Sequence, residues 1–190
     1  MQTDSHPQDS IAVLKRQWRH HLKNIREDLS FKRRQDASQY AFEELRVMCQ
    51  KARFVLSFAS FASEINLWTL NEELCIEGRL VLPFLTEKEG LYLFQVSHFS
   101  QLKLHRLGMV EPNPLICQQI DLSMIEIALI PGLGFDQEQK QRLGYGKGAY
   151  DKFLRFSSKI KKWGIGFLEQ KVVNLPFTDN DTSLDDIYLF

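Results

Sequence analysis

Apolar residues recur at steps of three and four positions along the first part of the chain, as they do on one face of an α-helix. The pattern predicts a helix that begins at Ile11, after a loose polar tail over residues 1–10. Ser30 is a suitable N-cap for a second helix that runs to about Gln50. The apolar stripe of the first helix consists of Ile11, Leu14, Trp18, Leu22, Ile25 and Leu29.

The pattern then changes to short apolar runs, which are typical of buried strands. After the first run, Asn66 is a suitable cap for a helix from Leu67 to about Cys75. Residues 98–114 carry glycine, proline and asparagine and predict irregular structure. A further helix is expected to begin near Lys147. The predicted strands are 53–60, 79–84, 91–96, 124–132, 162–168 and 185–190.

Strands that alternate with helices predict an α/β fold with a mainly parallel sheet. The chain has 190 residues, of which 44% are hydrophobic and 25% are charged. This composition fits one domain with a substantial core. We therefore expect a single α/β domain over residues 11–190, with no second-domain boundary.

Charge, cysteine content and hydrophobicity limit which kinds of protein the chain is expected to be. The 24 basic and 24 acidic residues give no net field, so a nucleic acid would need a local basic patch. Cys49, Cys75 and Cys117 have apolar neighbours and no paired spacing, which favours reduced core thiols in an intracellular protein. No apolar run is long enough to span a membrane, and the N-terminus lacks the apolar stretch of a signal peptide. We expect a cytoplasmic protein.

Lys15, Arg19 and Arg26 lie along one flank of the first helix's apolar stripe. A solvated basic face is the ordinary explanation. The alternative is that Lys15 and Arg19, four positions apart, point together into a cleft. The helix pattern alone favours the solvated face.

The segment RLGYGKGAYDKFL, residues 142–154, follows a predicted strand and leads into a predicted helix. Ligands of α/β sheets bind beyond the carboxyl ends of strands, where glycines let backbone N–H groups turn toward an anion. Arg142 and Lys147 would add positive charge, and Asp151 could hold a divalent cation that bridges phosphates. A nucleoside triphosphate with magnesium meets these requirements.

Two common nucleotide motifs are excluded. A Walker A loop needs Ser or Thr after its lysine, whereas Gly148 follows Lys147. The G-x-G-x-G spacing also differs from the dinucleotide fingerprint. A glycine-rich surface turn is the alternative, and the flanking charges favour a functional loop.

Together with PGLGFD, residues 131–136, the glycine segment closely resembles the signature of the 5-formyltetrahydrofolate cyclo-ligase family, also called methenyltetrahydrofolate synthetase. The resemblance implies a three-layer fold of the ribose-phosphate isomerase and CoA-transferase type. Five further blocks resemble the family in order along nearly the whole chain: KRQWR at 15–19, SFASFASEIN at 57–66, GMVEP at 108–112, GFLEQ at 166–170 and NDTSLDDI at 180–187.

The resemblance implies an enzyme that uses ATP and Mg²⁺ to convert 5-formyltetrahydrofolate to 5,10-methenyltetrahydrofolate. The formyl oxygen is phosphorylated, the ring closes, and ADP and phosphate are released. The expected partners are ATP and a reduced folate, without nucleic acid or membrane, and we expect a monomer.

The family's site residues map onto this chain by position. Catalytic roles fall on Lys147 and Arg142, magnesium binding falls on Asp151 and Asp181, and Gln170 matches a recurrent position without a role. Folate binding falls on Ala59, Glu64, Tyr145 and Ala149. ATP binding falls on Lys15, Arg19, Arg142, Leu143, Gly144, Tyr145, Gly146, Lys147, Gly148, Ala149 and Tyr150.

One departure from the family pattern leaves alternatives open. Many members carry two tyrosines before the aspartate, where this chain has Ala149 and Tyr150. A relative that binds folate or nucleotide without turnover is the second hypothesis, and Ala149 is its only support. A nucleic-acid binder that uses the basic flank is the weakest. Sugar-phosphate or CoA chemistry on the same fold is also open, because a fold does not determine a function.

Overall fold

A mixed sheet forms the centre of the computed structural model, which describes residues 7–86, 90–106, 108–146, 148–155 and 159–190. Within these residues the helices are α1 (Pro7–Glu27), α2 (Phe31–Cys49), α3 (Trp68–Ile76) and α4 (Ala149–Leu154), with 3-10 turns at Phe99–Gln101, Leu122–Met124 and Leu168–Gln170. The strands are β1 (Val55–Leu56), β2 (Leu80–Thr86), β3 (Gly90–Gln95), β4 (Leu102–Leu104), β5 (Val110–Pro112), β6 (Gln118–Gln119), β7 (Ile127–Pro131), β8 (Gly134–Asp136), β9 (Gln141–Leu143), β10 (Lys161–Gly166) and β11 (Asp186–Leu189).

The central sheet has the strand order β11-β10-β7-β1-β2-β3-β6. The first five strands in this order run parallel, and β3 and β6 continue the sheet antiparallel. Two small antiparallel pairs, β4 with β5 and β8 with β9, stand apart from it. The predicted α/β fold with a mainly parallel sheet is confirmed.

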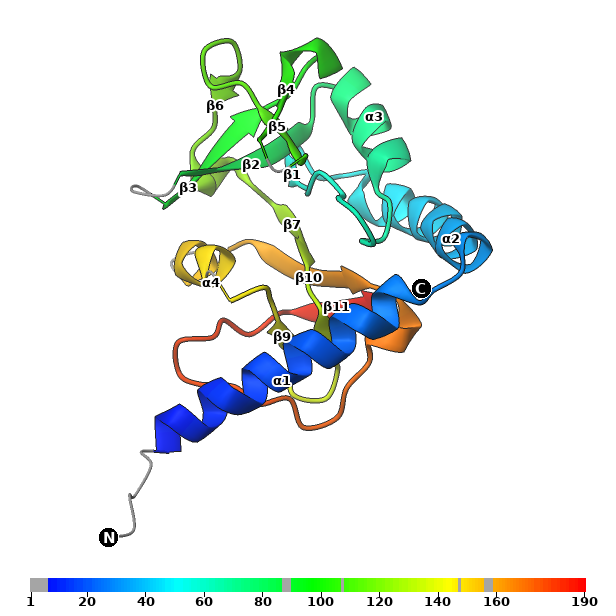
Figure 1. The fold of residues 1–190 in the computed structure, drawn as a ribbon. Coiled ribbons are helices and arrows are strands. Elements are labelled where there is room, and N and C mark those ends of the chain that lie inside the picture. The colour runs from blue at the N-terminus through cyan, green and yellow to red at the C-terminus, as the bar shows by residue number, and fades with distance from the viewer. Residues whose placement is uncertain (1–6, 87–89, 107, 147, 156–158) are drawn as a thin grey trace, which may run out of the picture.

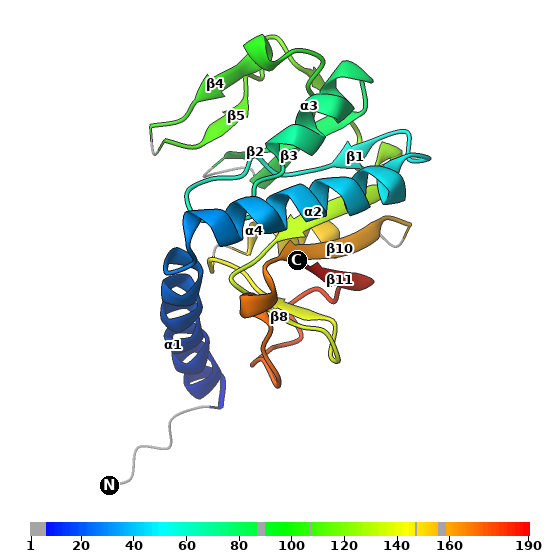
Figure 2. The ribbon, with the colours of Figure 1, turned by 90° about the vertical axis from the view of Figure 1, so that its right-hand side faces the viewer.

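Helices cover both faces of the sheet. Figures 1 and 2 show α2 and α3 on one face and α4 on the other. Successive residues of a strand point to opposite faces. Val55 and Leu129 therefore pack in the core beneath α2 and α3, whereas Leu56 and Ala128 pack in the core on the side of α4. The three-layer architecture implied by the family resemblance is present.

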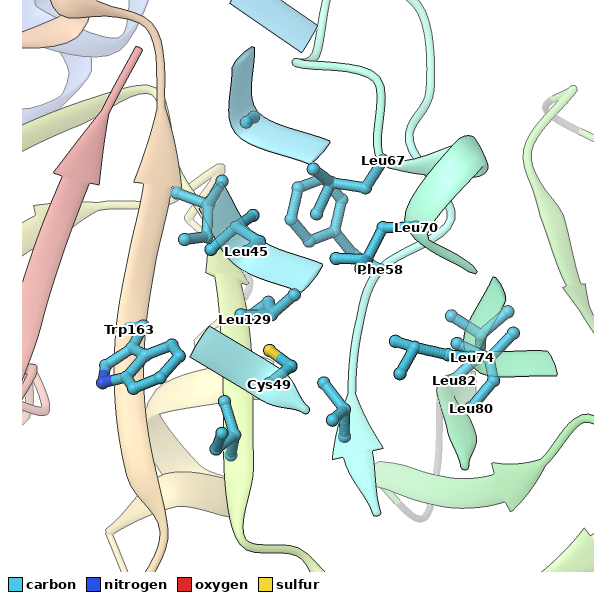
Figure 3. Packing of buried hydrophobic residues seen from close by; sticks show 14 of the residues in the cluster. Leu45, Cys49, Phe58, Leu67, Leu70, Leu74, Leu80, Leu82, Leu129 and Trp163 are labelled. Atoms are coloured by element: carbon cyan, nitrogen blue, oxygen red, sulfur yellow. The ribbon is translucent and has the colours of Figure 1, made fainter. Parts of the chain in front are cut away.

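The larger core lies between the sheet and the helices α2 and α3 (Figure 3). Leu45 and Cys49 reach it from α2, Leu74 from α3, and Leu82 and Leu129 from the sheet. Each of these side chains is at most 2% exposed. Burial of a leucine side chain contributes roughly 1.5–3 kcal/mol. This packing holds the parallel strands rigidly, so the loops at their carboxyl ends start from fixed positions.

The first helix is longer than its sequence pattern predicts. It begins at Pro7, four residues before the predicted start at Ile11. Proline suits the first turn of a helix, because its backbone has no N–H to leave unsatisfied there and its φ is already helical. The predicted tail over residues 1–10 is therefore helical from Pro7, and residues 1–6 lie outside the described chain.

Of the two caps predicted from the sequence, Ser30 is present, whereas the N-cap position of α3 is Leu67, which makes no side-chain capping bond. The Ser30 hydroxyl accepts a hydrogen bond from the Arg33 backbone N–H at 3.1 Å and begins α2. The Asn66 side chain accepts from the Trp68 N–H at 2.9 Å. Helix α3 begins at Trp68, one residue later than predicted.

The strand predicted over residues 53–60 is much shorter in the structure. Its ladder ends early because the Phe58 carbonyl accepts a hydrogen bond from the buried side chain of Asn71 at 3.0 Å instead of from a strand. Residues 98–114 were predicted to be irregular, which is wrong in part, since β4 and β5 pair there. Each of these strands has three residues, too few for a periodic pattern.

The hairpin of β8 and β9 lies in a stretch that the sequence pattern presented only as a connection. Its turn is held by Asp136, which is 2% exposed. One carboxylate oxygen of Asp136 accepts from the backbone N–H groups of Glu138 and Gln139, at 3.1 and 3.0 Å. The other oxygen accepts from the Leu175 N–H at 3.1 Å. The hairpin thus depends on a contact that is remote in sequence.

All three cysteines are buried and unpaired, as predicted. Burial raises the pKa of Cys49 to about 12, which keeps this thiol protonated. Among the helices of the described residues, none combines the length and the apolar character that a membrane span requires.

Candidate functional site

Helix α1 crosses the carboxyl ends of the parallel strands (Figure 2). Its apolar side packs through Leu22, with Trp18 and Ile25 beside it, against a small core that includes Leu133 and Leu143. Leu22 is 1% exposed. Because this side is buried, the basic flank of α1 faces the segment that follows β9.

Arg19 connects α1 to the glycine-rich segment. Its Nε donates to the Gly144 carbonyl at 2.9 Å. Gly146 has a φ of +95°, and a Cβ placed there would lie 3.2 Å from the Arg19 guanidinium carbon. A Cβ on Gly144 would lie 2.7 Å from an Arg142 nitrogen. Gly144 and Gly146 therefore allow the backbone to pass directly beside two arginines, which explains why glycines stand two positions apart here.

Arg142 and Asp151 form a partly buried ion pair, in which Nη2 donates to Oδ1 at 2.9 Å. The Arg142 guanidinium carbon also lies 5.5 Å from the centre of the Tyr150 ring. Among the polar side-chain atoms of the described residues, Arg142 Nε is buried without a hydrogen-bond partner. This arginine therefore has one buried donor that no described residue satisfies.

Lys15 pairs with Asp181, as α1 meets the segment before β11. Asp181 also accepts from the backbone N–H and the hydroxyl of Thr178, at 2.6 and 2.9 Å. Burial alone would raise the pKa of Asp181, but the hydrogen bonds from Lys15 and Thr178 outweigh it and lower the pKa below its usual value. The carboxylate is therefore ionised at neutral pH.

The two carboxylates predicted to bind metal lie on adjoining segments. The residue after Asp181, Thr182, donates its backbone N–H to Asp151 Oδ1 at 3.3 Å and its hydroxyl to the Asp151 carbonyl at 2.9 Å. Within the described residues, no group of three or more His, Cys, Asp or Glu could hold a metal ion by itself. The arrangement provides two carboxylates and no complete metal cage.

Glu64 and Tyr145, both predicted to bind folate, are joined by a hydrogen bond. The Tyr145 hydroxyl donates to Glu64 Oε1 at 3.2 Å, and the Phe61 N–H donates to Oε2 at 3.1 Å. Burial raises the pKa of Glu64, although the Phe61 N–H, Arg26 and Tyr145 oppose the shift. Ala59 packs against the larger core in the loop that leads to Glu64.

The remaining predicted residues belong to the stretch of sequence from β9 to α4. The side chain of Leu143 is buried in the core under α1, so only its backbone is available to a ligand. Gly148 has a left-handed φ of 61° and immediately precedes α4. Ala149 is the first residue of α4, and Lys147, the predicted main cation, lies outside the described residues.

Arg26 is a site residue whose individual role the sequence did not indicate. The charge pattern placed it on the same flank as Lys15 and Arg19, but nothing distinguished it as buried. It is 2% exposed and donates to Ser63 Oγ at 3.0 Å, to the Gly132 carbonyl at 3.4 Å and to the Tyr145 hydroxyl.

Gln170 has a structural role that its position in the sequence did not reveal. It is 1% exposed, and its amide donates to the carbonyls of Gly132 and Leu133 at 2.8 and 3.0 Å. Its amide oxygen accepts from the Phe167 N–H at 2.8 Å. Gln170 therefore ties the end of β10 to the end of β7, beside a crevice that Arg26 and Glu64 also line.

Comparison with known proteins identifies the family of the chain. The model of the 5-formyltetrahydrofolate cyclo-ligase family matches residues 11–189. The chain is 34% identical over 138 residues to the 5-formyltetrahydrofolate cyclo-ligase of Escherichia coli, a match that covers 70% of this chain and 75% of that protein. It is 23% identical to a probable 5-formyltetrahydrofolate cyclo-ligase of Caenorhabditis elegans, over 94% of this chain and 93% of that one.

Two solved structures resemble the fold. The 5,10-methenyltetrahydrofolate synthetase of Aquifex aeolicus superposes with a TM-score of 0.80 at 27% identity, over 92% of this chain and 88% of that one. A 5,10-methenyltetrahydrofolate synthetase of Mycoplasma pneumoniae gives a TM-score of 0.73 at 22% identity, over 91% and 96% of the two chains, and supports the fold. The chain belongs to the 5-formyltetrahydrofolate cyclo-ligase family.

Proposed function

We propose that the chain converts 5-formyltetrahydrofolate to 5,10-methenyltetrahydrofolate with ATP and Mg²⁺ and releases ADP and phosphate. The observation that carries the proposal is the convergence of two groups of residues on one loop. Arg19 of α1 and Arg142 lie against this loop, which is the nucleotide side. Tyr145 of the same loop bonds Glu64 on the folate side.

The chemistry explains why the proposed ATP site and the proposed folate site must adjoin. The oxygen of a formamide is a poor leaving group. Transfer of the ATP γ-phosphate to this oxygen makes an iminium phosphate, and the second amine of the folate then closes the ring and expels phosphate. Phosphoryl transfer depends mainly on positioning and on neutralisation of charge.

The nucleotide is assigned to the loop from Arg142 to Tyr150, with Lys15 and Arg19 approaching from α1. Arg142 supports this assignment because its Nε is a buried donor without a partner, which a phosphate oxygen would satisfy. Lys147 is assigned the main charge contact to the transferred phosphoryl group on the family resemblance.

Mg²⁺ is assigned to Asp151 and Asp181. Magnesium usually keeps several waters and binds through one or two carboxylates together with substrate phosphates. Two carboxylates on adjoining segments, each already paired with a cation, fit an ion that arrives with the nucleotide. Bound there, the ion would neutralise phosphate charge.

The folate is assigned to the crevice beside Glu64, and Ala59, Tyr145 and Ala149 are assigned to it on the family resemblance. A carboxylate next to an apolar wall suits the N–H groups of a pterin, and Phe58 and Ile165 supply part of that wall. The crevice in this structure is too narrow for a water molecule. Folate binding at this crevice would therefore require it to widen.

The proposal extends to a monomeric enzyme in the cytoplasm, with one catalytic domain over residues 11–190 and no nucleic-acid or membrane partner. A relative that binds without turnover is the second candidate, and Ala149 is the feature that favours it. The retained charges of Lys147, Asp151 and Asp181 favour turnover.

The test is to mix purified protein with 5-formyltetrahydrofolate, ATP and Mg²⁺ and to follow the near-ultraviolet band of the methenyl product. The band should grow in the complete mixture and fail to grow when ATP or Mg²⁺ is omitted. Absence of the band, with folate or ATP still binding by calorimetry, would favour the binding protein instead.

A further inference from the structure

Arg26 joins three segments that are far apart in sequence. From α1, its Nε donates to Ser63 in the loop before α3, Nη1 donates to the Gly132 carbonyl after β7, and Nη2 donates to the Tyr145 hydroxyl in the glycine-rich loop. A cation that is 2% exposed is costly to bury without such partners. The three hydrogen bonds therefore compensate the burial of Arg26 and hold it where the three segments meet.

The contact with Tyr145 continues to Glu64. The Tyr145 hydroxyl accepts from Arg26 and donates to Glu64 Oε1 at 3.2 Å. A hydroxyl that accepts from a cation is polarised and becomes a better donor to a carboxylate. With the Phe61 N–H on the other oxygen at 3.1 Å, the Glu64 carboxylate is held in one orientation.

We propose that Arg26 is a positioning residue for folate, which acts through the Tyr145 hydroxyl to orient the Glu64 carboxylate. This inference rests on the proposed function and deepens it. Arg26 and Glu64 line the same crevice at the carboxyl ends of the strands. Within the described residues Arg26 bonds Ser63, Gly132 and Tyr145 and none of Lys15, Arg19 or Arg142, so its effect is expected on folate more than on ATP.

The matched control for Arg26 is Arg33. Arg33 also makes a multiple contact, with both carboxylate oxygens of Glu169 at 2.7 and 2.9 Å and with the Phe190 carbonyl at 2.7 Å. It lies on α2, and its partners within the described residues are Glu169 and Phe190, not Tyr145 or Glu64. Arg33→Met removes a comparable set of arginine hydrogen bonds and leaves the hydrogen bonds from Arg26 to Tyr145 and from Tyr145 to Glu64 intact.

The experiment compares wild type with R26M, R26K, Y145F and R33M by steady-state kinetics and thermal unfolding. The loss of one hydrogen bond to a charged group is expected to raise the KM for folate of R26M about tenfold, with the KM for ATP changed less than about twofold. R26K keeps the charge and should recover part of the folate KM. R33M should unfold at a lower temperature and keep the folate KM of the wild type.

A folate KM in R26M within about twofold of wild type, with a thermal shift like that of R33M, would overturn the proposal. If R26M does not fold, Y145F is the substitute test. It removes only the Tyr145 hydroxyl, and Tyr145 is 52% exposed, so the fold should tolerate the change. An unchanged folate KM in Y145F would then overturn it, and the proposal would be supported if R26K raises the folate KM in wild type but adds nothing in Y145F. If wild type makes no product, the proposed function fails by itself. Folate affinity of the same variants by calorimetry then decides the role of Arg26.

Discussion

The guanidinium of Arg142 and the carboxylate of Asp151 lie 2.9 Å apart, across the whole glycine-rich segment. The pair connects the end of β9 to the first turn of α4. It therefore fixes both ends of the loop that is assigned to ATP and places the proposed metal ligand beside a cation that is proposed to bind phosphate.

Replacement of Arg142 by methionine is expected to weaken ATP binding. A charged hydrogen bond contributes about 1.5–3 kcal/mol, so the KM for ATP should rise roughly 10- to 100-fold. Arg142→Lys should recover little of this loss, since an ammonium cannot reproduce the planar fork of the guanidinium. Initial rates at varied ATP measure both variants. Wild-type ATP dependence in R142M would contradict the assignment.

Asp151→Asn is expected to raise the magnesium requirement. The amide keeps an oxygen that can accept from Arg142 but loses the charge that the metal needs. The Mg²⁺ concentration for half-maximal rate should rise about tenfold, corresponding to about 1.4 kcal/mol. Asp186→Asn is the control, because Asp186 also pairs with a lysine, Lys140, but lies on β11 away from the loop. If both variants keep the wild-type metal dependence, the site lies elsewhere.

Gly146→Ala should raise the KM for ATP, and this rise should exceed any effect of the lowered stability of the fold. The new Cβ would meet the Arg19 guanidinium at 3.2 Å, at a φ of +95°. Gly90→Ala is a close control, since Gly90 has a φ of +98° with nothing within 4 Å. Both substitutions should destabilise by about 1 kcal/mol through the left-handed backbone. Only Gly146→Ala should raise the KM for ATP, as initial-rate measurements would show, and equal kinetics in the two variants would count against the contact.

Asp181 is expected to stabilise the fold in a pH-dependent way. Its folded pKa is lowered, so its contribution is full above the unfolded pKa of about 3.9 and is lost as the pH falls through the folded pKa. The group is 21% exposed, so the contribution is at most about 1 kcal/mol. Urea unfolding of wild type and Asp181→Asn should show a difference at pH 6 that shrinks below about pH 4. A difference that grows on acidification would contradict the ion pair with Lys15.

Ala149→Tyr should restore the aromatic pair found in many family members. A stacked ring contributes about 0.5–1.5 kcal/mol beyond area burial, which corresponds to a KM for folate lower by up to about tenfold. Turnover should be intact. Initial rates at varied folate test this, and a folate KM that is unchanged or higher would argue against stacking at this position.

Much of the fold was predictable because its signals are local. The cap of α2 depends on Ser30 and a neighbour three positions away, and the buried strands are continuous apolar runs. The short pairs of β4 with β5 and of β8 with β9 were not predictable. Strands of three residues are too short to show a period, and the turn of β8 and β9 is tied by Asp136, which accepts a hydrogen bond from the N–H of the distant Leu175.

The same distinction applies to the candidate site. The glycine spacing indicated a loop that approaches charged groups closely, and the structure places Arg19 and Arg142 there. Arg26 was not recognised as a site residue, because its burial depends on Ser63, Gly132 and Tyr145, which come from three separate segments. A helical pattern records that a residue lies beside an apolar stripe, but not which remote segment covers it.

The measurement that tests the central claim most directly follows ADP and the methenyl product in one reaction. With 5-formyltetrahydrofolate, ATP and Mg²⁺ present, ADP and methenyl product should appear in equal amounts, and omission of folate should stop ADP release. Lys147→Ala, in the same assay, should slow both together. ADP release without methenyl product, or no release from wild type in the complete mixture, would contradict the cyclo-ligase reaction.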